Sequence, residues 1–113
     1  MAVKVNKKAV EKAKSLIKSG KIDQESDWSE AQPSADEENK FLDNHSWDEY
    51  SEWHLAIHTD ENNDTKGHFG FPYGDFKKIH RDGVIAAKQR AAQYDYSDVE
   101  KAADELLEMI DKK

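Results

Sequence analysis

The chain of 113 residues contains no cysteine, only two prolines and five glycines. The absence of cysteine excludes a disulfide framework, a thiolate zinc site and a cysteine nucleophile. No segment approaches the roughly 18 apolar residues of a membrane-spanning helix, and the N-terminal lysines precede no apolar run of signal-peptide length. These absences predict a soluble, cytoplasmic protein that has no membrane partner.

Large aliphatic residues and phenylalanine are also scarce. Leu, Ile, Val and Phe together number 20 of the 113 residues, below the roughly 20% under which a highly charged chain tends towards disorder. We therefore expect part of the chain to be unstructured. The length fits one domain with a single core.

Charge is distributed unevenly along the chain, whose net charge is −7. Residues 1–21 carry a net charge of +6, residues 22–65 carry −13, and residues 66–113 are balanced. A basic N-terminal segment and an acidic middle segment can attract one another within the fold.

The distribution of charged and apolar residues divides the chain into three regions. Residues 1–20 predict a basic amphipathic helix or arm that ends at Gly20, a typical C-cap residue. Its apolar residues recur at three- and four-residue steps and are Ala9, Val10, Ala13, Leu16 and Ile17. Residues 21–33 lack periodicity and predict a flexible acidic linker, from which Trp28 can fold back as an anchor. Residues 34–113 are expected to form a single globular domain.

Helix starts are signalled within that domain by the capping box, a Ser followed three residues later by Glu. Such pairs are Ser34 with Glu37, Ser46 with Glu49, and Ser97 with Glu100. Asp82 is expected to cap the preceding Ala-rich helix. The last helix has the clearest apolar stripe, formed by Val99, Ala102, Ala103, Leu106, Met109 and Ile110. The predicted class is mainly α (α+β), with a C-terminal antiparallel helix pair.

Residues 53–58 fit a helix and a strand almost equally, and helix is slightly favoured. The alternative is a short β hairpin with the segment after Gly67, in which Phe69, Phe71 and Tyr73 alternate with other residues. Six aromatic residues are expected to pack on the C-terminal helices, namely Trp47, Tyr50, Trp53, Phe69, Phe71 and Phe76.

Residues 65–111 resemble a segment of small uncharacterised bacterial and prophage proteins, and similar stretches form tails of phage head-associated proteins. The shared features are an aromatic–proline element at Phe71 and Pro72, an Ala-rich helix over 86–92 and paired alanines in the last helix. The resemblance implies no reaction and assigns no functional residues.

All five histidines lie within 36 residues, and His54 and His58 share a face in either a helix or a strand. An i, i+4 pair of histidines suits zinc, so a metal-dependent hydrolase is one alternative function. No HExxH motif is present, and histidines beside tryptophans commonly pack as amphipathic rings. We therefore expect no metal site, no cofactor and no catalytic residues.

A basic cluster surrounds the start of the Ala-rich helix, where exposed N–H groups can also receive an anion. Its members are Lys77, Lys78, His80, Arg81, Lys88 and Arg90. Together with the basic arm, this cluster makes a nucleic-acid-associated protein the second alternative. Nucleic-acid binders usually show a clearer basic stripe, which argues against it.

The leading hypothesis is a non-catalytic protein-interaction module, which the resemblance relates to phage or prophage proteins. It rests on the absence of a complete catalytic set and on the surplus of aromatic residues for so small a core. If exposed, Trp28, Tyr73 and Tyr94 are suited to anchoring a protein partner. The alternative is that all three are buried. The oligomeric state is left open.

Overall fold

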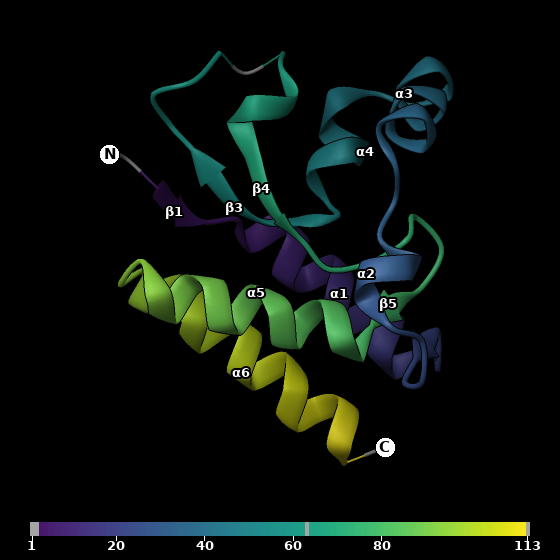
Figure 1. The fold of residues 1–113 in the computed structure, drawn as a ribbon, viewed down its shortest axis with the longest axis vertical. Coiled ribbons are helices and arrows are strands. Elements are labelled where there is room, and N and C mark those ends of the chain that lie inside the picture. The colour runs from purple at the N-terminus through teal and green to yellow at the C-terminus, as the bar shows by residue number, and fades with distance from the viewer. Residues whose placement is uncertain (1–2, 63, 113) are drawn as a thin grey trace.

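The computed structural model describes residues 3–62 and 64–112. This part of the chain forms six α-helices, one short 3₁₀ helix and two small sheets (Figure 1). In chain order the elements are β1 (Val3–Val5), α1 (Lys7–Lys18), β2 (Ile22–Asp23), α2 (Trp28–Ala31), α3 (Ala35–Asn44), α4 (Trp47–Ser51), β3 (His54–His58), a 3₁₀ helix (Lys66–His68), β4 (Phe69–Pro72), β5 (Ile79–His80), α5 (Arg81–Gln93) and α6 (Ser97–Asp111).

The larger sheet has the strand order β1-β3-β4 and is antiparallel throughout. Its central strand is β3, so the slight preference for a helix over residues 53–58 is wrong. Backbone pairing on both sides decides the outcome, because β1 pairs Val5 with Ala56 and β4 pairs Gly70 with the same residue. The hairpin between β3 and β4 is confirmed.

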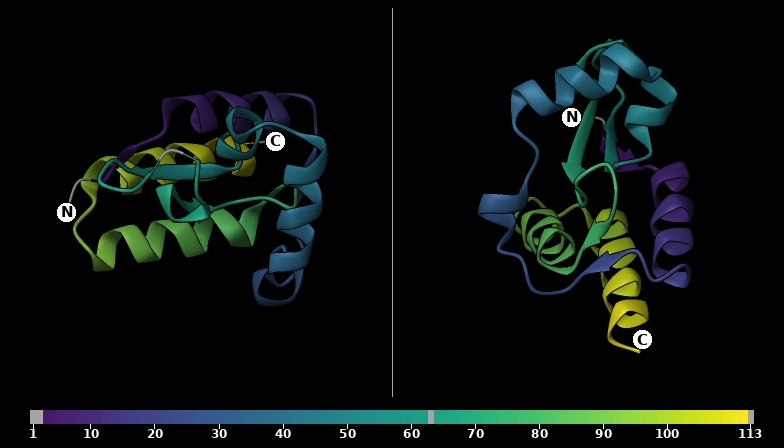
Figure 2. Two further views of the ribbon diagram at one scale, coloured as in Figure 1. Left: turned by 90° about the horizontal axis from the view of Figure 1, so that it is seen from above. Right: turned by 90° about the vertical axis from the view of Figure 1, so that its right-hand side faces the viewer.

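Helices α1, α6 and α5 lie side by side below this sheet, with α6 in the middle (Figure 2). Helix α1 buries Ala9, Ala13 and Leu16 in the core, and three of its lysines are exposed, namely Lys7, Lys8 and Lys18. The helix ends as its sequence predicts. Gly20 adopts a φ of 76°, and the N–H of Lys21 donates to the carbonyl of Leu16 at 2.9 Å.

The predicted C-terminal antiparallel helix pair is present as α5 and α6. The stripe of α6 is buried at Val99, Ala103, Leu106 and Ile110. The turn between the helices depends on Asp95, whose φ is 58°, and is closed by the N–H of Tyr96 donating to the carbonyl of Ala91 at 2.8 Å.

Two of the three capping boxes are confirmed, at Ser34 and Ser46. The third is wrong, because α6 already begins at Ser97 and Tyr96 is its N-cap. The N–H of Glu100, which the hydroxyl of Ser97 would accept in a capping box, donates to the backbone carbonyl of Tyr96 at 3.0 Å. Asp82 does not cap α5 either, since that helix begins at Arg81.

Residues 21–33, for which a flexible linker was expected, carry β2 and α2. Strand β2 pairs in parallel with β5, which aligns Asp23 with His80. The carboxylate of Asp82 accepts a hydrogen bond from the backbone N–H of Trp28 at 2.7 Å, and the indole of Trp28 is only 7% exposed. The segment is therefore attached to α5 at the start of α2.

One hydrophobic core extends from Ala9 in α1 to Ile110 in α6. Of the six aromatic residues expected to pack on the C-terminal helices, Trp53 and Phe71 belong to this core. Trp47, Tyr50 and Phe69 contact one another in a neighbouring cluster that α4 and β4 build. None of the helices in residues 3–62 and 64–112 has both the length and the apolar character that a membrane span requires.

Candidate binding site

The structure separates the three aromatic residues that were proposed as anchors. Tyr73 is fully buried, its ring stacks on Trp53 at 5.7 Å, and its hydroxyl donates to the carbonyl of Glu52 at 2.7 Å. Trp28 is also buried, with its ring 5.4 Å from that of His80. Tyr94, in contrast, is 52% exposed. Tyr73 therefore has a structural role, and Tyr94 is the aromatic residue that is free to anchor a partner.

The predicted basic cluster is divided in the same way. The guanidinium of Arg81 pairs with Asp111 through two hydrogen bonds of 2.9 and 3.3 Å, and the ammonium of Lys88 lies 2.8 Å from Asp104. Hydrogen bonding to the partner carboxylate raises the pKa of both cations. The imidazole of His80 is 2% exposed. Arg90 remains exposed, as do Lys77 and Lys78.

Helix α6 therefore neutralises part of the surface that was considered for nucleic acid. The two acids responsible, Asp104 and Asp111, both lie on α6. Nucleic-acid affinity depends on several cations acting on phosphates together. The pairing of Arg81 and Lys88 consequently weakens that alternative.

The two histidines considered as metal ligands both lie on β3, but only His58 is accessible. The Nδ1 atom of His54 is 2.9 Å from the carbonyl of Tyr50, and its ring packs against Tyr50 and Phe69. Because a carbonyl only accepts, Nδ1 carries the proton. Burial lowers the pKa of His54 to about 4. Within the described residues, no group of three or more histidines and acids is placed to hold a metal ion.

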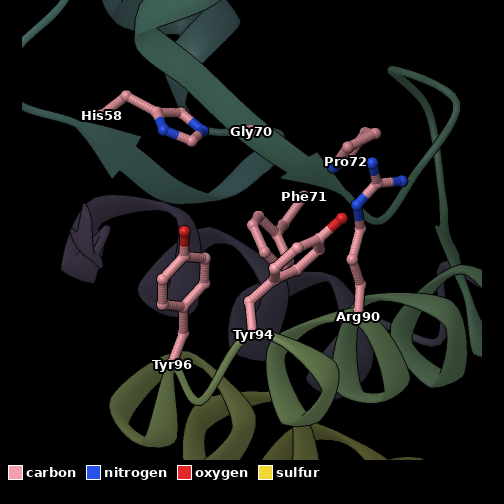
Figure 3. A pocket seen from close by; sticks show the side chains of 7 residues that line it. All are labelled: His58, Gly70, Phe71, Pro72, Arg90, Tyr94 and Tyr96. Carbon is pink, nitrogen blue, oxygen red and sulfur yellow. The ribbon is translucent and has the colours of Figure 1, made fainter. Parts of the chain in front are cut away.

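The site that the fold builds is a pocket of about 430 Å³ between the sheet and the C-terminal end of α5 (Figure 3). Its lining residues are His58, Gly70, Phe71, Pro72, Arg90, Tyr94 and Tyr96. The phenol rings of Tyr94 and Tyr96 rise from the helix turn towards the sheet, and the guanidinium of Arg90 lies beside Pro72.

The two tyrosines reach the pocket together because of the turn between α5 and α6. Asp95 adopts a left-handed conformation, which an Asp tolerates better than most residues. Its neighbours Tyr94 and Tyr96 consequently stack at a centroid distance of 5.9 Å with an angle of 25° between the rings. The turn therefore creates a continuous aromatic wall.

The opposite wall depends on two backbone features of β4. A β-carbon on Gly70 would lie 2.8 Å from Nε2 of His58, so the glycine makes room for the imidazole. Phe71 has a φ of 63°, a strained conformation for a non-glycine residue. Its ring forms the floor of the pocket and meets Tyr96 edge-on at 5.9 Å.

A second hollow of about 140 Å³ adjoins the pocket and is shared at Phe71, Pro72 and Arg90. Its remaining lining residues are Trp28, Gln32, Ala86 and Ala87. We call the two hollows together the α5 groove. Arg90 lies where they meet.

The charge of the α5 groove is opposite to that of the chain. The 24 acids outnumber the 17 basic residues in the sequence, but among residues 3–62 and 64–112 no carboxylate lines either hollow. Arg81 is paired, whereas Arg90 forms no ion pair within the described part of the chain. The groove thus combines an unpaired guanidinium and an imidazole with aromatic and proline surfaces.

Sequence reasoning identified Arg90 and Tyr94 but missed His58 as a groove residue, together with Gly70 and Tyr96. The aromatic–proline element at Phe71 and Pro72 lines the groove, a role that the sequence pattern does not indicate. A local signal was available at the helix turn, where two tyrosines flank a single Asp. No protein-family model, curated protein or solved structure matches this chain.

Proposed function

We propose that this protein is a non-catalytic protein-interaction module that receives its partner in the α5 groove. The observation that carries the proposal is the exposure of Tyr94. Within residues 3–62 and 64–112 it is the only exposed large hydrophobic side chain, and it stands at the rim of the pocket. Tyrosine and arginine are the residues that most often dominate binding energy at protein interfaces.

The composition of the groove supports recognition. Phe71, Tyr94 and Tyr96 provide apolar surface, and Arg90 provides directed hydrogen-bond donors next to that surface. Apolar walls with a few polar groups are typical of sites that fix a ligand in one orientation. On the resemblance of residues 65–111, we also propose that the module is related to phage or prophage proteins.

Site-specific photocrosslinking tests the proposal. A benzophenone amino acid is placed at Tyr94 or, as the control, at Gln89, which is exposed on α5 outside both hollows. In cells of the native host, we expect a discrete protein adduct from position 94 that is absent from position 89. The identified partner should then bind the purified Tyr94→Ala variant at least tenfold more weakly. Identical adducts at both positions would contradict the proposal.

A further inference from the structure

The partner segment that fits the α5 groove can be specified by its chemistry, on the premise that the proposed function holds. We infer that the groove binds an extended acidic peptide segment, with a carboxylate on Arg90 and a proline or aromatic ring on Tyr94 and Tyr96. Charge, shape and surface chemistry each contribute to this inference.

Charge complementarity selects an anion. The surface as a whole repels negative segments because the net charge is −7, whereas in the described part of the chain no carboxylate lines the groove. Arg90 has its guanidinium free at the junction of the two hollows. A guanidinium binds a carboxylate through two parallel hydrogen bonds, and such bonds are about twice as strong as neutral ones.

The shape of the groove selects an extended segment. Its lining on α5 runs from Ala86 to Tyr94, which corresponds to about 12 Å along the helix axis. Extended chain advances about 3.3 Å per residue, so about four residues span this length. The opposite wall is β4, which contributes Gly70, Phe71 and Pro72 along the same direction.

The surface chemistry selects a ring at one end. Tyr94 and Tyr96 are stacked with 25° between their planes, and Phe71 forms the floor beside them. Aromatic-lined grooves of this kind accept proline rings, which lose little conformational entropy on binding. They also accept aromatic side chains in offset or edge-on contact.

A single-stranded nucleic acid is less compatible with these features, although its bases also stack on tyrosine. Binding along a phosphate backbone needs a succession of cations. The two hollows offer one arginine and one histidine, and the nearby cations of Arg81 and Lys88 are engaged by Asp111 and Asp104. We therefore assign the groove to a peptide.

Peptide selection tests this assignment. Random twelve-residue peptides displayed on phage are selected on the immobilised full chain and counter-selected on the Tyr94→Ala variant. The most enriched peptide is then synthesised and titrated by calorimetry against the unchanged chain and against Arg90→Gln, Arg90→Lys and Lys77→Gln. Lys77 is exposed and lies outside both hollows, so it controls for the loss of one positive charge.

We expect a consensus in which Asp or Glu lies within a few residues of Pro or an aromatic residue. Arg90→Gln should weaken binding at least tenfold, Arg90→Lys should weaken it less, and Lys77→Gln should leave it within twofold. A consensus without acids, or binding that Arg90→Gln leaves unchanged, overturns the peptide chemistry while leaving the protein-interaction function intact.

Two further outcomes are decisive. If no selected peptide needs Tyr94 for binding but the photocrosslinked partner does, the groove recognises a folded surface. The inference about the peptide then fails, and the proposed function stands. If neither depends on Tyr94, the proposed function fails as well. If a labelled ten-nucleotide oligothymidine binds the unchanged chain in competition with the peptide, and this binding is lost in Arg90→Gln, the groove is reassigned to nucleic acid.

Discussion

The Nε2 atom of His80 lies 3.0 Å from a carboxylate oxygen of Asp75, although the histidine side chain is only 2% exposed. On the other side of the ring, Nδ1 is 3.9 Å from the carboxylate of Asp23. Within the described residues, neither ring nitrogen makes an aligned hydrogen bond. His80 thus connects the β2 segment to the turn before β5.

We expect His80→Phe to lower the free energy of unfolding by about 2 kcal/mol at pH 7, because Asp75 loses its partly buried partner. Partial burial opposes ionisation of Asp75, but the contacts with His80 and the N–H groups of Lys77 and Lys78 outweigh it and lower its pKa. This stabilisation is present above the ordinary pKa of an Asp and is lost in stronger acid. The difference in free energy of unfolding between the unchanged chain and His80→Phe should therefore shrink as the pH falls below about 4.

Urea unfolding of the unchanged chain and of His80→Phe between pH 7 and pH 2.5 measures this effect. His45→Phe is the control, because His45 is exposed and already stacks on Phe41. It should change stability by less than about 0.5 kcal/mol. An equally large deficit for His80→Phe at every pH would show that only ring packing is involved.

A second prediction concerns His54, whose pKa is lowered to about 4 by burial. The unfolded chain takes up this proton near the ordinary pKa of 6.5, whereas the folded chain resists protonation until pH 4. Stability is therefore complete above pH 6.5 and should fall by roughly 3 kcal/mol as the pH drops to 4.

His54→Asn removes this titration and keeps a donor for the carbonyl of Tyr50. The slope of unfolding free energy between pH 6.5 and 4 should become shallower in this variant. The pKa of His54 can also be read directly from its ring proton shifts in NMR, and a value near 6.5 would contradict the prediction.

A third prediction compares the loss of stability in Gly74→Ala with that in Gly70→Ala. In Gly74→Ala the new β-carbon would lie 2.5 Å from the backbone oxygen of Lys78 and 2.7 Å from the indole of Trp53. In Gly70→Ala the close atom is the end of the His58 side chain, which can rotate away. We expect losses of about 2–3 kcal/mol for Gly74→Ala and less than about 1 kcal/mol for Gly70→Ala.

Thermal and urea unfolding of both variants provide the measurement. Gly70→Ala should nevertheless weaken peptide binding, because displacement of His58 changes the wall of the α5 groove. Similar stability losses in the two variants would mean that His58 is held as rigidly as the backbone.

A fourth prediction separates the structural tyrosine from the binding tyrosine. Tyr73→Phe leaves the carbonyl of Glu52 without its 2.7 Å donor and should cost about 1 kcal/mol. Tyr94→Phe, at a 52% exposed position, should change stability by less than about 0.5 kcal/mol. Equal effects on the midpoint of urea unfolding would contradict these assignments.

Much of the helical framework was predictable because its signals are local. The capping boxes at Ser34 and Ser46 and the left-handed Gly20 involve residues at most five positions apart. The strand over 53–58 was harder, since its alternation also fits a helix and the deciding hydrogen bonds come from residues 3–5 and 69–72. Asp82 was misassigned for a similar reason, because its partner is 54 positions away at Trp28.

The C-terminal helix pair and the α+β class were thus determined by the sequence itself, through the apolar stripe of α6 and the chemistry of helix ends. The α5 groove was decided by the tertiary structure. Its walls come from His58, Gly70 and Tyr96, which no periodicity connects, and its floor needs Phe71 in a strained backbone conformation. Long-range packing alone brings these side chains together around Arg90, which has no carboxylate partner among the described residues.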